Sequence, residues 1–425
     1  MQSLLTAINS VASIGIIFSS ARMLIGATSA VYLLSKGITA SEIGIMKSFQ
    51  ALLLMLLDFP LGVLADRKGR RICLILGGLA GASWLALTAA TSTFWVLLIA
   101  EGLNALSLAA FNGAFDALLA EKYISERGRP ALNRLLGDYH AVLFAMMALF
   151  SLAGGTFVSP ESSFFWWVAS GILLTLTALI PLLISNDSEF RKQRNEAASV
   201  AVKPSLLKLI QEDFALVLKQ IWTVPEVRKL AMPFIIIGVF YQLIIPYWQL
   251  FFTNSNHDFF VIYGFKMSFF GPLFFGILVI QSLISKSLGI PSVANASQRS
   301  LLGGVAVSVV SLTLAVYFQA QLWLCIAATL GVFALVRLYT LSASAQLHNL
   351  IEDSRRASVL SALSVFTRVI LVVVLPVSGF MIESFGVWCL PLLGALLTLF
   401  CMAASSSATT LKFYFKNKRQ LSEPA

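Results

Sequence analysis

Long apolar stretches alternate with short polar ones along the whole chain. Each apolar stretch holds about twenty residues, and a helix of that length crosses the ~30 Å hydrocarbon core of a membrane. Ten-residue segments of alternating hydrophobicity, which a transmembrane β-barrel requires, do not occur in the sequence. The pattern predicts an all-α membrane protein with twelve transmembrane helices, at residues 11–34, 41–65, 72–92, 94–120, 135–158, 164–184, 230–253, 259–284, 300–318, 321–347, 359–382 and 386–408.

The composition supports a membrane protein. Apolar residues make up 58% of the chain and charged residues only 12%, whereas soluble domains carry about 25% charged residues. The first apolar stretch is not typical of a cleaved signal peptide, because it lacks a basic leader and carries Arg22 at its centre.

The basic residues are distributed unevenly between the two sides of the predicted bundle. If the N-terminus is cytoplasmic, 24 of the 30 Lys and Arg residues fall in cytoplasmic loops or the tail, and only Lys36 falls in an outer loop. By the positive-inside rule, both termini are therefore expected in the cytoplasm. The net charge of +10 follows from this topology, so it does not indicate nucleic-acid binding.

A polar stretch divides the chain into two halves of six predicted helices. Within it, residues 204–222 have the spacing of an amphipathic helix lying on the inner leaflet. A shift of 219 residues places Lys47 on Lys266, a faint internal repeat that supports two pseudo-symmetric halves. The predicted parts are an N-terminal half at 1–185, a cytoplasmic linker at 186–229, a C-terminal half at 230–410 and a basic cytoplasmic tail at 411–425.

The turn between the second and third predicted helices carries a recognisable motif. Residues 58–71 read DFPLGVLADRKGRR. The motif is similar to the loop 2–3 signature of the major facilitator superfamily, G-x-L-a-D-r-x-G-r-k. This resemblance, together with the twelve-span layout, implies a secondary active transporter with two six-helix halves around one central site. The matching residues are Gly62, Leu64, Ala65, Asp66, Arg67, Gly69, Arg70 and Arg71.

In that family the loop forms part of a latch between the halves on the cytoplasmic side. Gly62 would allow close approach of a neighbouring helix, and Gly69 the sharp turn. Asp66 would meet the start of the eleventh helix, where the helix dipole favours an anion. Arg70 would reach an acid at the cytoplasmic end of the fourth helix, for which Asp116 is the first choice. Glu121 is the second choice, and the alternative is a basic turn that only sets orientation.

Several polar side chains lie inside the predicted spans. A charge at mid-bilayer costs about 2.5–3.5 kcal/mol on insertion scales, so it usually faces protein or water. Structural ion pairs between helices are the alternative for the charged members. The family resemblance implies that the first, fourth, seventh and tenth helices line the cavity. The candidate cavity residues are Arg22, Glu101, Asn104, Asn112, Tyr241, Gln242, Trp248, Arg337 and Arg368.

Glu101 is the candidate for proton coupling, because coupling needs a group that exchanges a proton in an apolar setting, and Arg22 could control it. Many family members have an arginine at this point in the fourth helix, so that arginine's role does not transfer to Glu101. The antiporter signature G-P-x-x-G-G of the fifth helix is half present. Gly154 and Gly155 match it, whereas Phe150 and Ser151 do not.

Lys47 and Lys266 occupy equivalent positions in the two predicted halves, about two turns below the outer ends of the second and eighth helices. Such lysines can snorkel to the membrane interface. The alternative is a paired basic outer gate above the cavity that attracts anions.

No P-loop, hydrolase or metal-ligand motif occurs in the sequence, and the four cysteines have no metal-ligand spacing. We therefore expect neither an enzyme nor a bound metal or cofactor. The favoured function is proton-coupled export of a small amphiphilic or anionic compound, such as a drug-like metabolite or siderophore. The alternatives are proton symport of an anionic nutrient and a non-transporting sensor. We expect a monomer in a bacterial inner membrane whose partners are its substrate, protons and lipid.

Overall fold

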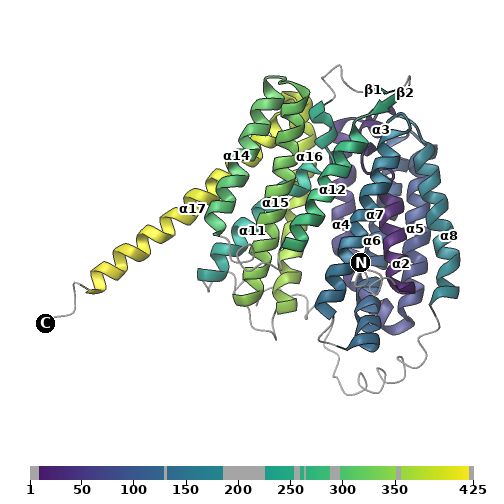
Figure 1. The fold of residues 1–425 in the computed structure, drawn as a ribbon, viewed down its shortest axis with the longest axis horizontal. Coiled ribbons are helices and arrows are strands. Elements are labelled where there is room, and N and C mark those ends of the chain that lie inside the picture. Colours follow the sequence, from purple (N-terminus) through teal and green to yellow (C-terminus); the bar gives the residue numbers. More distant parts are fainter. Residues whose placement is uncertain are drawn as a thin grey trace.

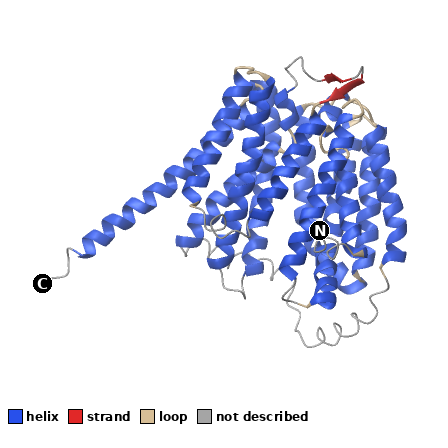
Figure 2. Ribbon diagram, in the orientation of Figure 1, coloured by secondary structure: helices blue, strands red, loops and turns tan. Residues whose placement is uncertain are grey.

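The computed structural model describes residues 9–128, 132–184, 225–252, 259–262, 265–287, 297–350 and 356–420. The amphipathic linker helix expected at 204–222 lies outside these residues. Helices dominate the described part of the chain (Figure 2). The N-terminal half contains α2 (Ser10–Met23), α3 (Ser29–Ser35), α4 (Ala40–Lys68), α5 (Arg70–Ala90), α6 (Phe94–Arg127), α7 (Leu132–Thr156) and α8 (Phe164–Leu183).

The C-terminal half packs beside the N-terminal half as a second group of helices (Figure 1). One antiparallel hairpin, β1 with β2, lies at the top of the bundle in that view. We call this the hairpin end, and the opposite end, where α4 turns into α5 at Gly69, the turn end. The second half contains α11 (Pro225–Ile244), the 3-10 helix η2 (Trp248–Phe252), β1 (Phe259–Ile262), β2 (Phe265–Ser268), α12 (Phe270–Ser287), α14 (Gln298–Tyr317), α15 (Leu322–Leu350), α16 (Arg356–Phe385) and α17 (Cys389–Gln420).

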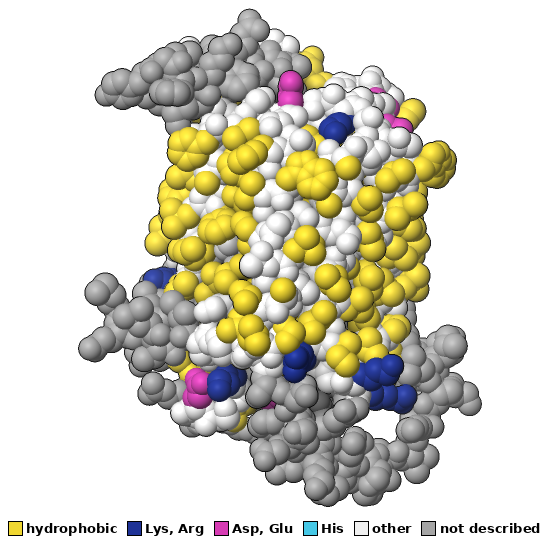
Figure 3. Space-filling view, turned by 90° about the vertical axis from the view of Figure 1, so that its right-hand side faces the viewer, with side chains coloured by type: hydrophobic (Ala, Val, Ile, Leu, Met, Phe, Trp, Pro, Cys, Tyr) yellow, Lys and Arg dark blue, Asp and Glu magenta, His cyan; other side chains and the backbone are white. Residues whose placement is uncertain are grey.

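The helices suit a membrane in both length and surface. Among the described residues, nine helices are long and apolar enough to cross a bilayer. Three shorter apolar segments in the same part of the chain are α2, nearly all of α12 and the first half of α17. The count of twelve spans stays a prediction. Hydrophobic side chains cover the middle of the face shown in Figure 3, and most Lys and Arg side chains on that face lie near its lower edge. This distribution is the one a lipid-exposed bundle requires.

Three predicted helices differ from their observed forms. The first, expected as continuous, breaks between α2 and α3, where Gly26 and the β-branched Thr28 disfavour a helix. The seventh ends at Ile244, two residues before Pro246, which cannot donate a backbone hydrogen bond. The eighth begins only at Phe270, because the aromatic and β-branched residues before it form the hairpin.

The two halves meet closely along α4 and α16. A methyl group on Gly44 would lie 2.5 Å from the carbonyl oxygen of Leu375, and one on Gly379 would lie 2.4 Å from that of Ala40. One turn further along α4, the hydroxyl of Ser48 donates a 2.6 Å hydrogen bond to the carbonyl oxygen of Val372. Glycine is therefore required at this seam because two backbones approach each other directly.

A second close approach joins α7 to α12. A methyl group on Gly155 would lie 2.7 Å from the Cα atom of Gly271. Both glycines lie near the hairpin end, as do Gly44 and Gly379. The described close contacts between the halves therefore gather toward the hairpin end of the bundle.

We predict that Gly44→Ala destabilises the protein, because the added methyl group must push the α16 backbone away. Overpacking of this kind typically costs about 1–3 kcal/mol. Gly171→Ala on α8 is the matched control, since nothing lies within 4 Å of its Cβ position. The control should be neutral or stabilising by about 0.5–1 kcal/mol, the helix preference of alanine over glycine. Thermal unfolding in detergent micelles measures both; an equal effect of the two changes would contradict close packing at Gly44.

Candidate functional site

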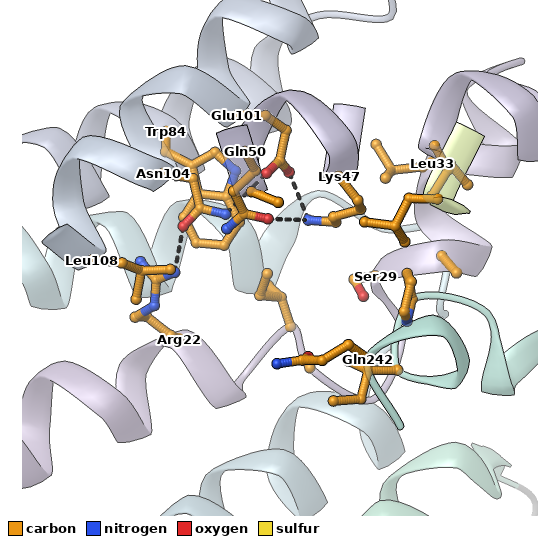
Figure 4. Close-up of a pocket in the computed structure, with 18 of the residues that line it drawn as sticks. Arg22, Ser29, Leu33, Lys47, Gln50, Trp84, Glu101, Asn104, Leu108 and Gln242 are labelled. Atoms are coloured by element: carbon orange, nitrogen blue, oxygen red, sulfur yellow. Dashed lines mark hydrogen bonds and ion pairs between the residues drawn. The ribbon is translucent and has the colours of Figure 1, made fainter. Parts of the chain in front are cut away.

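A cavity of about 390 Å³ lies between the two halves. Its N-half wall comes from α2, α3, α4, α5, α6 and α8, and its C-half wall from the broken seventh helix, α12 and α16. Figure 4 shows Lys47 and Arg22 on opposite sides of Glu101 and Asn104, with Gln242 facing them from the other half. Three tryptophans, Trp84, Trp166 and Trp248, line the cavity together with a larger number of aliphatic side chains.

Four side chains form a continuous polar chain along the N-half wall. Lys47 Nζ lies 2.9 Å from Glu101 Oε1, and Asn104 Nδ2 donates a 3.0 Å hydrogen bond to Glu101 Oε2. Arg22 in turn donates to Asn104 Oδ1 (Figure 4). Glu101 is only 3% exposed, so its charge depends on Lys47 and Asn104. The amide of Asn104 therefore links the anion Glu101 to the cation Arg22.

Two hydrogen-bond donors on the cavity wall have no partner. They are Arg22 Nη1 and Trp84 Nε1, both shielded from solvent. The guanidinium of Arg22 also lies over the Trp84 ring, with its carbon 4.5 Å from the ring centroid. A buried donor left without a partner costs about 1–3 kcal/mol. Both side chains line the cavity, so an occupant with acceptor atoms recovers this energy when these donors turn toward it.

The described charges of the cavity do not balance. Its charged wall residues are Arg22, Lys47, Glu101 and Arg368. Arg368 pairs with Asp58 of α4, across the boundary between the halves. With Lys47 paired to Glu101, one positive charge is left over among these residues, and Arg22 carries it. The electrostatics of the cavity therefore favour an anion.

The structure brings most of the sequence-predicted cavity residues together. Those that line the cavity are Arg22, Glu101, Asn104, Gln242, Trp248 and Arg368. Asn112 is exposed on α6 and does not line it. Tyr241 and Arg337 lie in a neighbouring polar cluster instead, where Gln281 donates to the Tyr241 hydroxyl at 3.0 Å and Arg337 contacts Phe144 of the other half at 5.8 Å.

The sequence analysis missed several wall residues. Gln50 lies on the same face of α4 as Lys47, and their spacing of three residues was a readable signal. Trp84 and Trp166 were not readable, because a tryptophan in an apolar helix is equally common on a lipid-facing side. Ser29 lines the cavity only because the first helix breaks next to it.

The predicted outer gate of Lys47 and Lys266 has a different geometry in the structure. Lys266 lies in β2, outside α12, so it is not two turns down a helix. Lys47 points into the cavity toward Glu101 rather than to the membrane interface (Figure 4). The hairpin that precedes α12 therefore removes the helical equivalence on which the pairing rested.

The predicted latch has a different acid. Arg70 is 6% exposed and pairs with Glu121, the second choice, with a 2.7 Å bond to Glu121 Oε1. Asp116 is exposed one and a half turns earlier on α6. Gly69 has a φ of 102°, a left-handed value that favours glycine. Nothing lies within 4 Å of the Cβ position of Gly62, so the expected close approach there is absent, and the side chain of Asp66 lies outside the described part of the structure.

Two helical halves around a charged cavity define the class of protein, a helical membrane transporter. The sequence pattern described as Major Facilitator Superfamily matches residues 11–296. The chain therefore belongs to the major facilitator superfamily and is a transporter, not an enzyme.

Solved transporter structures share the fold. A crystal structure of the nucleoside transporter NupG matches with a TM-score of 0.68 and 11% identity, covering 96% of this chain and 99% of NupG. A bacterial homologue of the human drug peptide transporters PepT1 and PepT2 matches with a TM-score of 0.64 and 13% identity, covering 98% of each chain. No curated protein sequence matches the chain. At these identities the likeness extends to the fold alone.

We predict that Glu121→Gln destabilises the protein, whereas Asp116→Asn does not. The first change leaves the buried guanidinium of Arg70 without its carboxylate, and the second leaves that pair intact. Because Glu121 is half-exposed, the expected loss is about 1–2 kcal/mol, between the values for surface and buried pairs. Thermal unfolding in micelles checks the ranking, and a larger effect of Asp116→Asn would show that Asp116 is the partner.

Proposed function

We propose that the protein is a proton-coupled symporter for a compact monoanion with an apolar body. The observation that carries the proposal is the uncompensated Arg22, which lines the cavity and has one buried donor without a partner. An anion bound beside Arg22 restores the charge balance and accepts hydrogen bonds from the N–H groups of Arg22 and Trp84. Its apolar body contacts the rings of Trp166 and Trp248.

The charge of the cavity also sets the direction of coupling. When Glu101 takes up a proton, the wall gains one positive charge and Lys47 loses its carboxylate partner. Both changes strengthen the binding of an anion. Linkage is reciprocal, so a bound anion strengthens the binding of the proton to the same degree. Proton and anion therefore bind together and travel in the same direction.

Export by proton antiport, favoured in the sequence analysis, needs the opposite relation. In an antiporter the proton and the substrate compete for one site, and a cation competes with a proton for Glu101, whereas an anion does not. The aromatic wall suits an exported amphiphile, so antiport of an amphiphilic cation is our second candidate. The two candidates predict opposite signs of substrate charge and opposite directions of proton flow.

The cavity volume guides the choice of substrate. A cavity of about 390 Å³ accommodates a small aromatic or aliphatic acid.

We propose that the turn end faces the cytoplasm, in agreement with the positive-inside rule. The close glycine contacts between the halves lie toward the hairpin end. In this arrangement the cavity exchanges its contents with the cytoplasm. The opposite state forms when the α4–α16 and α7–α12 seams separate.

A flux experiment with three probes of matched size tests the proposal. Purified protein is reconstituted in liposomes that contain a pH indicator, and benzenesulfonate, benzenesulfonamide or benzyltrimethylammonium is added outside. We expect benzenesulfonate alone to drive protons inward, since it is a permanent anion that cannot carry them as a free acid. Outward proton movement with benzyltrimethylammonium would favour the antiport candidate, and no response to any probe would contradict both.

We predict that Arg22→Gln weakens benzenesulfonate binding about tenfold to a hundredfold. One charge-assisted hydrogen bond contributes about 1.5–3 kcal/mol, and 1.4 kcal/mol corresponds to a factor of ten. Arg337→Gln is the matched control, since it removes an intramembrane arginine that does not line the cavity. Titration calorimetry in micelles measures both dissociation constants. Equal losses would place the anion elsewhere.

We predict that Glu101→Gln abolishes proton movement but keeps anion binding. Glutamine carries no titratable proton, and it frees Lys47 permanently, as protonation does in the parent protein. The affinity for benzenesulfonate should therefore equal that of the protonated parent and no longer change with pH. A mutant affinity that varies with pH as the parent's does would rule out Glu101 as the coupling group.

A further inference from the structure

The amide of Gln249 takes the place of a missing helix hydrogen bond in the other half. In a continuous α-helix the N–H of Ala30 would donate to the carbonyl oxygen of Gly26, four residues earlier. In the structure the Ala30 N–H donates instead to Gln249 Oε1 at 2.7 Å. Gln249 Nε2 donates in turn to the carbonyl oxygen of Gly26 at 3.1 Å. The side-chain amide thus bridges the peptide groups of Gly26 and Ala30. Within the same break, the N–H groups of Gly26 and Thr28 donate to carbonyl oxygens three residues earlier rather than four.

This bridge lies at the break between α2 and α3. Gln249 comes from η2 of the C-terminal half and is 1% exposed, so its amide has no competing water on the surface. A primary amide suits the position, because it offers a donor and an acceptor side by side. Two residues earlier, the Tyr247 hydroxyl donates to the carbonyl oxygen of Ala40 at 3.1 Å, a second bond from the same segment to the N-terminal half.

The two interrupted helices correspond to each other. The 219-residue shift places Ala30 on Gln249 and the α2–α3 break on the α11–η2 break. Interruptions at matching positions of two transporter halves commonly mark the substrate site. Here both flank the cavity, since Gly26 and Ser29 line it from one half and Pro246 and Trp248 from the other.

We propose that Gln249 is a positioning residue that holds the first helix broken while the hairpin end is closed. When the halves separate at that end, the amide leaves and the Ala30 N–H bonds to the Gly26 carbonyl oxygen. The break then closes into a continuous helix. Because Gly26, Ser29 and Ala30 are wall residues, this change reshapes the anion cavity as it opens.

The backbone accounts for the reversibility of this switch. In either state the Ala30 N–H and the Gly26 carbonyl oxygen are both satisfied, first by Gln249 and then by each other. Neither state leaves a peptide group unpaired in an apolar medium, which would cost several kcal/mol. The side-chain amide of Gln249 then needs new hydrogen-bond partners, and water supplies them once the hairpin end is open.

The inference rests on the proposed transport cycle, yet its test requires no substrate. A cysteine at Ser29 reports the cavity wall beside the break, and the chain without it gives the baseline from the four buried native thiols. A membrane-impermeant maleimide is applied from each side, in right-side-out and inside-out vesicles. The variants are Gln249→Leu and Gln249→Glu, and Gln321→Leu, a substitution of another glutamine at the same end, is the control.

Gln249→Leu removes both bonds, so labelling of the Ser29→Cys thiol from the hairpin-end side should rise at least tenfold above the parent. The Gln249→Glu carboxylate accepts from Ala30 but repels the Gly26 carbonyl oxygen, so labelling should rise near pH 8. Near pH 5 a protonated carboxyl both donates and accepts, as the amide does, and labelling should return toward the parent value measured at the same pH. Gln321→Leu should match the parent throughout.

Parent-like labelling of Gln249→Leu would overturn the proposal, and so would labelling of Gln249→Glu that is the same at both pH values. If Gln249→Leu does not reach the membrane, the labelling of Gln249→Glu at the two pH values decides the question. That comparison uses one folded variant under two conditions. A lack of flux with all three probes would count against the proposed substrate only. The sided labelling does not depend on it.

Discussion

A peptide group in the hydrocarbon core of a membrane must find its hydrogen-bond partner within the protein, and the contact between the two halves depends on this constraint. Pro376 in α16 has no N–H, so the carbonyl oxygen of Val372 lacks its helix partner. Ser48 of the other half donates to that oxygen at 2.6 Å. In the opposite direction, Gln249 of the C-terminal half forms hydrogen bonds with the peptide groups of Gly26 and Ala30, where the first helix is interrupted. Each half therefore completes the backbone of the other at the hairpin end.

Partners supplied by the protein itself also explain how charges are tolerated in the cavity. Glu101 is buried, and it accepts from Lys47 and from Asn104, which satisfies the carboxylate without water. Arg22 is treated differently, since it has one amide partner, an aromatic ring beneath it and one free donor. It also lies in the last turn of α2, where the carbonyl ends of a helix offset part of a positive charge. The site therefore holds a cation that keeps one buried donor without a partner.

The length and hydropathy of the apolar stretches were sufficient to predict an all-helical membrane protein, because both are local properties of a sequence. They could not locate the breaks, since Gly26 and Pro246 are both tolerated inside membrane helices when another residue satisfies the backbone. The satisfying residue, Gln249, is 219 positions away from Ala30. The predicted partners of Arg70 and Lys47 were wrong or missing for a similar reason, because they depend on how separate helices pack. Asp116 and Glu121 both lie at the turn end of α6, and only packing selects Glu121 for Arg70. The position of Lys47 in the sequence indicates the face of α4 on which it lies. It does not indicate its partner, because Glu101 belongs to another helix.

The α2–α3 break places the two functions of a transporter on neighbouring residues. Arg22, which carries the uncompensated charge, lies four residues before Gly26, whose carbonyl oxygen is bonded across the halves. In the proposed cycle, an anion at Arg22 therefore acts about one helical turn from the bond between Gly26 and Gln249. In a rigid continuous helix those two events would be coupled only through movement of the whole helix. With a break between them, α3 stays bonded to the C-terminal half only while the hairpin end is closed, and α2 keeps Arg22 beside Asn104 in either state of the proposed cycle. Substrate recognition and closure can then be strong individually without one preventing the other.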